Sequence, residues 1–325
     1  AQGVRMIFGG ATSEEAIAAG QRAHDLGLLY FATLSYADEV TGSAGHRYLF
    51  RESNSARMSA RVLGEYLGWN MPRQRYHYIL VDDTWGRSIE TELRTSTASQ
   101  DRARHGRSAL PAHAAMRKDY LAALNKAAAS DADILVLALL GDDLQRTLRL
   151  AHNLKLHTRM QIIVPHLSKS IVQQIGPKVM AGVIGTEAWT WQVPAQEQSA
   201  SGQAFVQAYI GHYQEYPASS AASAYSIVMQ WADAVRRSGS LASEPLIGAL
   251  EDHRYSLLKG PQQWRAFDHQ NVQNVYAVRV HSRQHIMQDP LKQDYFEIIH
   301  QMAGDSAAPS LDDWQQERGD QLSLQ

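Results

Sequence analysis

The chain has 325 residues, of which 44% are hydrophobic and 20% are charged, a composition typical of globular proteins. This length exceeds the usual size of one hydrophobic core, so it predicts two lobes. The formal net charge is −2, from 31 basic and 33 acidic residues, which argues against a nucleic-acid binder or a polybasic membrane binder. The absence of cysteine excludes disulfides, thiolate metal ligands and a cysteine nucleophile.

The apolar runs are too short to span a bilayer, and Ile134–Leu140 is one of the longest. The first residues, AQGVRMIFGG, carry no signal-peptide pattern.

Short apolar runs alternate along the chain with amphipathic stretches of helical period. The runs that predict strands are Arg5–Gly9, Leu28–Thr33, Tyr76–Val81, Ile134–Leu140, Gln161–Val164 and Val179–Ile184. The stretches that predict helices are Glu14–Leu26, Ala56–Leu67, His113–Ala129, Asp143–Asn153 and Ser168–Ile175. Continuous hydrophobicity is typical of strands buried on both faces of a parallel sheet. The order therefore predicts an α/β fold with helices on both sheet faces.

Two helix starts carry local signals. Thr12 begins a T-x-x-E capping-box pattern directly after a predicted strand. Asp142 and Asp143 follow another predicted strand, as N-cap and first-turn acids do. Helix capping is the plainest interpretation of these residues at a strand-to-helix junction.

The pattern changes after Ile184. EAWTWQVP (187–194) predicts an extended crossover between lobes, and 199–214 and 219–237 predict two long helices. LKGPQQWRAFDHQNVQNVYAVRV (258–280) predicts turn, strand, turn and strand, a hairpin-like return. The polar segment 304–325 predicts a loose tail.

Common catalytic and nucleotide motifs are absent. The sequence contains no G-x-G-x-x-G, G-x-x-x-x-G-K-[ST], H-E-x-x-H or G-x-S-x-G. The scattered histidines, among them His212, His253, His269, His281 and His285, show no spacing that predicts a metal site. We therefore expect no catalytic residue, no metal and no cofactor.

The segment LVDDTWGRS (80–88) combines paired acids with an aromatic residue. Asp82 and Asp83 could ligate a hard cation, but such a site needs several converging oxygens that no nearby pattern supplies. Capping of the next helix is the favoured interpretation. Trp85 stands at the carboxyl end of a strand, where open α/β sheets bind ligands. Its alternative role is packing under its own loop.

Three further clusters follow predicted strands. The backbone amides and hydroxyls at Thr12 and Ser13 suit a carboxylate, although ordinary capping explains them equally well. Ser35 and Tyr36 end the next strand, within LSYADE (34–39). His166, within VPHLS (164–168), lies just past a buried strand, at the same kind of position.

Several stretches, in this order, resemble the type I periplasmic binding proteins, specifically the branched-chain amino acid and amide subfamily that serves ABC importers. They are IFGGATSEEA (7–16), GLLYFATLSYADEVTG (27–42), HRYLFRESNSA (46–56), ILVDDTWGRS (79–88), ADILVLALLGDDLQRTLRLAHNLKL (132–156), AGVIGTEAW (181–189), SAYSIVMQWADAV (223–235) and WRAFDHQNVQNVYAVRV (264–280). The resemblance runs from residue 1 to about residue 300. The Trp-Gly turn and the Phe-Asp-His-Gln hairpin are specific only in combination.

The resemblance implies two Rossmann-like lobes with parallel sheets, joined by three crossovers, with the ligand in a hinge cleft. Lobe I would comprise 1–51 and 190–258, and lobe II 52–189 and 259–300, with 301–325 as a C-terminal tail. The crossovers would fall near Arg51–Glu52, Trp189–Trp191 and Leu258–Pro261.

The resemblance also implies a set of ligand contacts. Thr12 and Ser13 would hold a ligand carboxylate, and Trp85 would cover the ligand from the second lobe. The full set is Thr12, Ser13, Ser35, Tyr36, Trp85, His166 and Tyr225.

Two departures from the family pattern bear on the ligand. His166 stands where amino-acid binders usually place an acid for the ligand ammonium, and Leu140 stands where a cleft aromatic often occurs. Both favour a ligand without an ammonium, such as a small amide or an aromatic or aliphatic acid.

A third departure concerns the first lobe. Family members begin with two further strand–helix units, on the order of 60 residues, before the equivalent of Arg5–Gly9. We therefore expect an incomplete lobe I with exposed strand edges, completed by a longer chain or by a partner.

Taken together, these features predict a periplasmic or extracellular solute-binding protein that delivers a small polar ligand to an ABC transporter permease, without a nucleic-acid partner. The ligand would be an amino acid, an amide or a small carboxylic acid. One alternative is the ligand-sensing domain of a receptor that acts on a signalling module. The other is an α/β enzyme using Asp82, Asp83 and His166, which the missing motifs disfavour.

Overall fold

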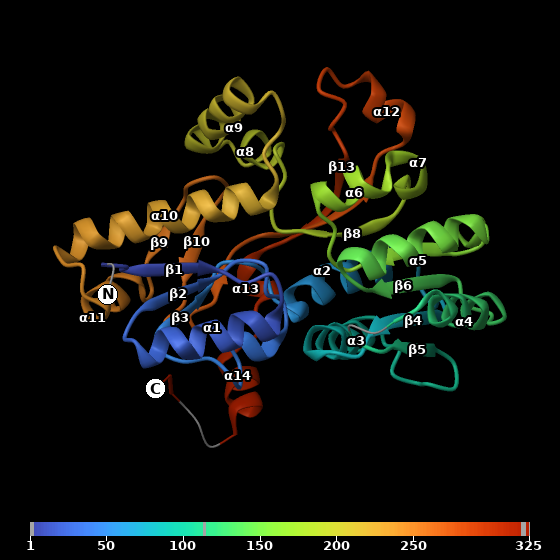
Figure 1. Ribbon diagram of the computed structural model, residues 1–325, viewed down its shortest axis with the longest axis horizontal. Coiled ribbons are helices and arrows are strands. Elements are labelled where there is room, and N and C mark those ends of the chain that lie inside the picture. Colours follow the sequence, from blue (N-terminus) through green and yellow to red (C-terminus); the bar gives the residue numbers. More distant parts are fainter. Residues whose placement is uncertain (1–2, 113–114, 320–322, 325) are drawn as a thin grey trace. The chain divides into compact units, whose positions relative to one another are not determined.

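The computed structural model describes residues 3–112, 115–319 and 323–324 (Figure 1). The chain divides into two compact units, each assembled from separate segments. Unit 1 comprises the chain up to Met58, Ala188–Asn274 and the chain from Ala303 onward. Unit 2 comprises Ser59–Glu187 and Val275–Met302. The expected boundaries differ chiefly at 259–274 and after 303, because both segments belong to unit 1.

Unit 1 contains two small sheets and their covering helices. Its elements are β1 (Met6–Gly9), α1 (Ser13–Asp25), β2 (Leu29–Ala32), η1 (Asp38–Val40), β3 (Leu49–Arg51), α8 (Val193–Gln196), α9 (Ala200–Tyr213), α10 (Ser219–Ser238), α11 (Ser243–Leu250), β9 (Arg254–Tyr255), β10 (Gln262–Trp264), β11 (Asn271–Val272), α13 (Gly304–Ala307) and α14 (Leu311–Arg318). Helix α2 (Ala56–Asn70) begins in unit 1 and continues in unit 2.

Unit 2 alternates strands and helices around one larger sheet. Its elements are β4 (Tyr76–Val81), α3 (Thr84–Ser96), β5 (Gly106–Leu110), α4 (Arg117–Ala128), β6 (Ile134–Ala138), α5 (Gly141–Asn153), η2 (Leu156–Thr158), β7 (Gln161–Val164), α6 (Lys169–Ile175), α7 (Pro177–Met180), β8 (Ile184–Glu187), β12 (Val275–Val280), α12 (Arg283–Gln288) and β13 (Phe296–Met302).

The parallel sheet of unit 1 has the order β1-β2-β3 and is covered on both faces. On one face Phe31 and Phe50 pack with Trp264 and with apolar residues of α10 and α11. The other face lies under α1, where a Cβ added to Gly20 would come within 2.6 Å of Leu49 Cδ1. The small residue at position 20 therefore lets α1 approach the sheet closely.

The hairpin expected within 258–280 is formed by β10 and β11, which pair antiparallel with β9 beside them. The last predicted strand of that segment, β12, instead pairs with β8 and β13 in the sheet of unit 2. One continuous stretch of sequence thus supplies strands to both units, which a sequence pattern cannot distinguish.

The sheet of unit 2 has seven strands in the order β13-β12-β8-β7-β6-β4-β5. Strands β4 to β8 are parallel, and β12 and β13 are antiparallel additions at one side. The chain moves one way from β4 to β5 and the other way from β5 through β8. Right-handed crossovers therefore place α3 on one face and α4 to α7 on the other, and α4, α5 and α6 contact one another in series (Figure 1).

The predicted strand at Val179–Ile184 is wrong. Pro177 begins the short helix α7, and the strand β8 starts only at Ile184. Gly182, with φ +79°, makes the turn between them. Among the elements that were not predicted from the sequence are β3, β5, β9, β13, α8 and α11 to α14. Of the helix predicted from His113, residues 113–114 lie outside the described residues, and α4 begins at Arg117.

The segment after residue 303 is not a loose tail over its described residues. It forms α13 and α14, and Trp314 is buried with its indole N–H donating to the carbonyl of Thr41 at 2.9 Å. Arg318 donates to the carbonyls of Gly42 and Gly45 at 2.6 and 2.8 Å. Two large side chains therefore anchor a segment whose overall composition is polar.

None of the helices in the described ranges combines the length and apolarity that a membrane crossing requires.

Candidate functional site

The carboxyl ends of β1, β2 and β3 share one edge of the unit 1 sheet, since the strands are parallel. Thr12, directly before α1, accepts the N–H of Glu15 at 3.1 Å and so caps the helix. Glu15 in turn accepts the N–H of Ala11 at 3.0 Å. Ser13 is buried and accepts the N–H of Ala37 at 3.1 Å. Both hydroxyls therefore hold the backbone, and each can still donate its O–H to a ligand oxygen.

Ser35 and Tyr36 follow β2 and reach the same edge. The Ser35 hydroxyl donates to the carbonyl of Thr12 at 3.3 Å, which joins the loops after β1 and β2. Tyr36 is half-buried, and its carbonyl accepts the N–H of Ala56, the first residue of α2, at 2.6 Å. The structure thus brings together four predicted residues, Thr12, Ser13, Ser35 and Tyr36, in one network.

The segment after β3 adds a buried polar group that was predicted only as part of a crossover. Glu52 is 5% exposed, and its carboxylate accepts the hydroxyl of Ser223 on α10 at 2.5 Å. Buried carboxylates need such partners, and one at a strand's carboxyl end is a candidate for ligand contact. The sequence signal was the polar run Glu-Ser-Asn-Ser directly after an apolar strand.

Tyr225 does not join this group. Residues two positions apart on a helix are separated by about 200° around its axis, so Tyr225 points away from the side of α10 on which Ser223 meets Glu52. Tyr225 is 38% exposed and packs on Phe205 of α9 at a ring-centroid distance of 4.8 Å. The residue of α10 that faces the sheet edge is therefore Ser223.

In unit 2, the paired acids after β4 act structurally. Asp83 is the N-cap of α3 and accepts the N–H of Gly86 at 2.7 Å. Asp82 is exposed and pairs with Arg87 at 3.1 Å. The capping interpretation is therefore confirmed for Asp83, whereas Asp82 forms an exposed ion pair instead.

After β6 the acids are also structural, but Asp142 is not the cap. Leu140 is the N-cap residue of α5, and Asp142 and Asp143 lie in its first turn. Asp143 accepts the hydroxyl of Tyr120 at 2.5 Å.

Trp85 and His166 meet in unit 2, although 81 positions separate them in sequence. Their ring centroids are 5.8 Å apart, and both side chains are buried. They follow β4 and β7, which flank β6 on its two sides. The two rings therefore come together at the carboxyl end of β6, at the edge where parallel α/β sheets place ligands. Among the described residues, no acceptor lies within hydrogen-bonding distance of the buried Trp85 indole N–H.

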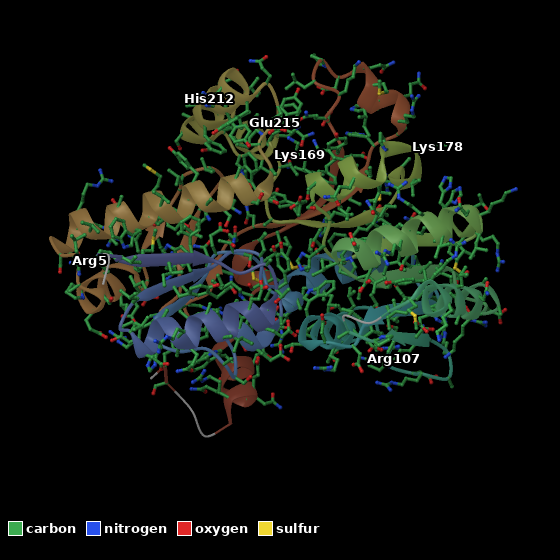
Figure 2. All side chains as sticks on the ribbon, viewed as in Figure 1. Arg5, Arg107, Lys169, Lys178, His212 and Glu215 are labelled. Carbon is green, nitrogen blue, oxygen red and sulfur yellow. The ribbon has the colours of Figure 1, made fainter. Side chains whose placement is uncertain are left out.

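Burial lowers the pKa of His166 to about 3, so this imidazole is neutral at physiological pH. It can exchange hydrogen bonds with a ligand but brings no positive charge. Lys169 lies in the first turn of α6, directly after the loop that carries His166, is 8% exposed and is labelled in Figure 2. Lys169 carries no signal in the sequence, because an isolated lysine is ordinarily exposed.

Both edges thus carry hydrogen-bonding groups on loops after parallel strands, with a carboxylate in unit 1 and aromatic rings in unit 2. None of these residues belongs to the group of metal-ligating side chains found in the described part of the chain. The sequence profile of the periplasmic binding proteins matches residues 1–285. The chain belongs to the periplasmic binding protein family.

This is a family of non-catalytic solute-binding proteins. Comparison with curated proteins yields no match.

Solved structures share the fold at low sequence identity. A periplasmic binding protein from Burkholderia mallei has a TM-score of 0.81 at 20% identity, covering 96% of this chain and 80% of that one. An amino acid ABC transporter substrate-binding protein from Pseudomonas fluorescens Pf-5 has a TM-score of 0.80 at 23% identity, with 93% and 78% covered. A solute-binding protein of an ABC transporter from Rhodopseudomonas palustris BisB5, in complex with 3,4-dihydroxybenzoic acid, has a TM-score of 0.75 at 16% identity, with 93% and 79% covered.

Proposed function

We propose that this periplasmic binding protein captures a small carboxylate-bearing solute and presents it to the permease of an ABC importer. The observation that carries the proposal is the buried Trp85–His166 pair, whose indole N–H has no acceptor among the described residues and lies at a sheet edge suited to ligands. Similar folds serve an amino acid transporter and bind a dihydroxybenzoic acid, so both ligand classes fit this scaffold.

The groups of unit 1 are proposed to contact the same solute. The hydroxyls of Thr12 and Ser13 and the first-turn amides of α1 suit a carboxylate, and Tyr36 borders them. A solute that uses both groups of residues would shift the equilibrium between open and closed states of the protein.

The ligand proposal is tested by a thermal-shift screen of amino acids, amides, and aliphatic and aromatic carboxylic acids, followed by calorimetric titration of the best solute. Trp85→Phe keeps a ring but removes the N–H. We expect about twofold to tenfold weaker binding, because one net hydrogen bond contributes about 0.5–1.5 kcal/mol. Trp231→Phe is the matched control, since its buried N–H also lacks an acceptor among the described residues but lies on α10.

Unchanged affinity in Trp85→Phe, or equal losses in both variants, would contradict the role given to Trp85. Stabilisation by no member of the panel would contradict the solute class.

The effect of Glu52→Gln on affinity tests whether the solute also carries an ammonium group. If it does, Glu52→Gln removes a charge-assisted partner, and we expect a loss of affinity of about tenfold or more. A simple carboxylic acid should bind the same variant equally well or more tightly, because a buried negative charge has been removed. Calorimetric titration of the two solute types against wild type and Glu52→Gln separates these outcomes.

A ligand-sensing domain remains the second candidate, because solute capture by the same residues would serve a signalling module equally well. Stimulation of a permease's ATPase by the loaded protein favours transport. Solute binding without such stimulation favours sensing.

A further inference from the structure

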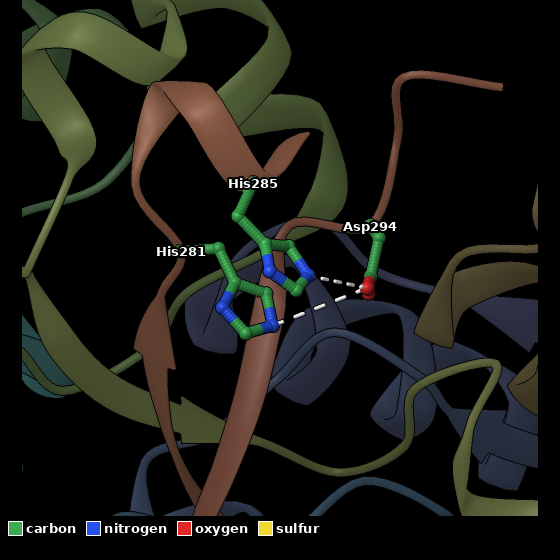
Figure 3. Close-up of side chains that lie close together, drawn as sticks. All are labelled: His281, His285 and Asp294. Carbon is green, nitrogen blue, oxygen red and sulfur yellow. Dashed lines mark hydrogen bonds and ion pairs between the residues drawn. The ribbon is translucent and has the colours of Figure 1, made fainter. Parts of the chain in front are cut away.

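We propose that unit 2 contains a site for a first-row divalent metal ion of the zinc class, formed by His281, His285 and Asp294. Their ligand atoms all lie within 4.8 Å of one another (Figure 3). The spacing of the histidines along the sequence predicted no metal site, because two residues alone do not form one. The chain's fold supplies the third ligand, Asp294.

Local backbone structure positions the three residues. His281 follows β12, and its N–H donates to the carbonyl of Tyr295 at 2.8 Å, so the chain before β13 runs alongside it. Asp294 is the neighbour of Tyr295 and is thereby held opposite His281. Ser282 caps α12 by accepting the N–H of His285 at 3.2 Å, which fixes the first helical turn beside the loop.

The side chains converge on one carboxylate oxygen. Nε2 of His285 lies 3.0 Å from Oδ2 of Asp294, and Nε2 of His281 lies 4.0 Å from the same atom. The two imidazoles are stacked with centroids 3.7 Å apart and an interplanar angle of 18°, so both rings present Nε2 in one direction (Figure 3). Ligand atoms at about 2.0–2.2 Å from a tetrahedral zinc ion are roughly 3.3 Å apart, which the two distances bracket.

The donor set defines the class of ion. Two imidazole nitrogens and one carboxylate oxygen suit Zn²⁺, Co²⁺, Ni²⁺ or Cu²⁺. Mg²⁺ and Ca²⁺ prefer shells of oxygen ligands and are not expected to bind. The side chains of His281 and Asp294 are 19% and 17% exposed, whereas that of His285 is 48% exposed. An ion would therefore be reached from solvent beside His285, with room for water in the fourth position.

The site is separate from the proposed solute contacts. Strand β12 is antiparallel to β8, so His281 lies at the amino ends of the parallel strands. Trp85 and His166 lie at their carboxyl ends. The metal proposal therefore does not rest on the proposed function, and substitutions at the metal site should leave solute binding unchanged.

The test uses the full chain, stripped with a chelator and dialysed, then titrated with Zn²⁺ against a chromophoric competitor. We expect one Zn²⁺ per chain and affinities at least about tenfold weaker in His285→Ala and Asp294→Asn. Zn²⁺ should also raise the unfolding temperature of wild type by mass action, but not that of either variant. Mg²⁺ should do neither.

His157→Ala is the matched control. His152 and His157 are also stacked, with centroids 4.4 Å apart, but they belong to no metal-ligating group among the described residues. Retained zinc binding in this variant with loss in Asp294→Asn supports the site. Absence of stoichiometric binding in wild type, or an equal loss in His157→Ala, overturns it. If Asp294→Asn unfolds in the absence of metal, His281→Gln replaces it and must show the same loss of zinc.

Discussion

The two units build parallel sheets from similar apolar runs, yet the surroundings of those sheets differ. In unit 2, β6 has neighbours on both sides and is fully buried along its length. In unit 1, β1 pairs with β2 alone among the described strands, and Phe8 on it is 42% exposed. A continuous hydrophobic run therefore predicts a strand, but the neighbours of that strand decide whether it becomes core.

The two units also differ in the groups that lie at the carboxyl ends of their parallel strands. Unit 1 offers hydroxyls, helix amides and the buried carboxylate of Glu52, whereas unit 2 offers the rings of Trp85 and His166. The groups of unit 1 are thus mainly hydroxyls, amides and a carboxylate, whereas those of unit 2 are aromatic rings that carry N–H groups. The predictions below test both contrasts, beginning with the largest expected effect.

The largest expected difference between the two sheets is the loss in free energy of unfolding when a side chain on a strand is truncated. Leu137 on β6 is fully buried, so Leu137→Ala is expected to lower the free energy of unfolding by about 2–5 kcal/mol. Phe8→Ala on β1 should lower it clearly less, because 42% of Phe8 is exposed and the substitution removes less buried surface. Urea denaturation followed by circular dichroism measures both. Equal losses would mean that β1 is as well buried as β6.

The buried His166 should make stability depend on pH. Its folded pKa of about 3 lies below the ordinary value of 6.5, so the unfolded chain takes up a proton first as the pH falls. The contribution of this residue is fully present above about pH 6.5 and is lost towards pH 3, by at most about 1.4 kcal/mol per pH unit.

Unfolding temperatures of wild type and His166→Gln at pH 7.5 and pH 5 check this expectation. The variant should lose less stability on acidification than wild type. His212→Gln is the control, since the His212 side chain is exposed. A steeper pH dependence in His166→Gln would refute the assignment.

The smallest expected difference between the two sheets lies in the hydrogen-exchange rates of single backbone amides. Those N–H groups of β1 that point away from β2 should exchange quickly, whereas those of β6 should be among the slowest in the chain. The expectation that a further segment or a partner completes this sheet stays a prediction. Slow exchange of every β1 amide would show that the edge is covered.

Much of the fold follows from local pattern, and the failures have physical causes. Strands β4 and β7 have the predicted bounds because each is a short, mainly apolar run. Strand β3 was missed because it is short and ends in Arg51, a residue normally exposed. Arg51 is instead buried and donates to Gln270, 219 positions away, at 2.6 Å. Such a partner is invisible to a pattern read along the chain.

The candidate site could likewise be predicted only in part. Trp85 and His166 could be predicted as edge residues, since each follows a strand. Their mutual contact could not, because it depends on β6 lying between β4 and β7. Glu52 was missed because its burial depends on Ser223. Tyr225 lies apart from the unit 1 group, because the family resemblance gives its position on α10 but not its side of the helix, and its contact with a ligand stays a prediction.

The most direct test of solute binding by residues of both units is hydrogen exchange with and without the solute found by the screen. We expect slower exchange at two separate sets of loops, residues 10–13 with 33–37 in unit 1 and residues 82–87 with 165–169 in unit 2. Exchange at 281–294 should not change. Slower exchange in only one unit, or none at either set of loops, would contradict the claim that both units bind the solute.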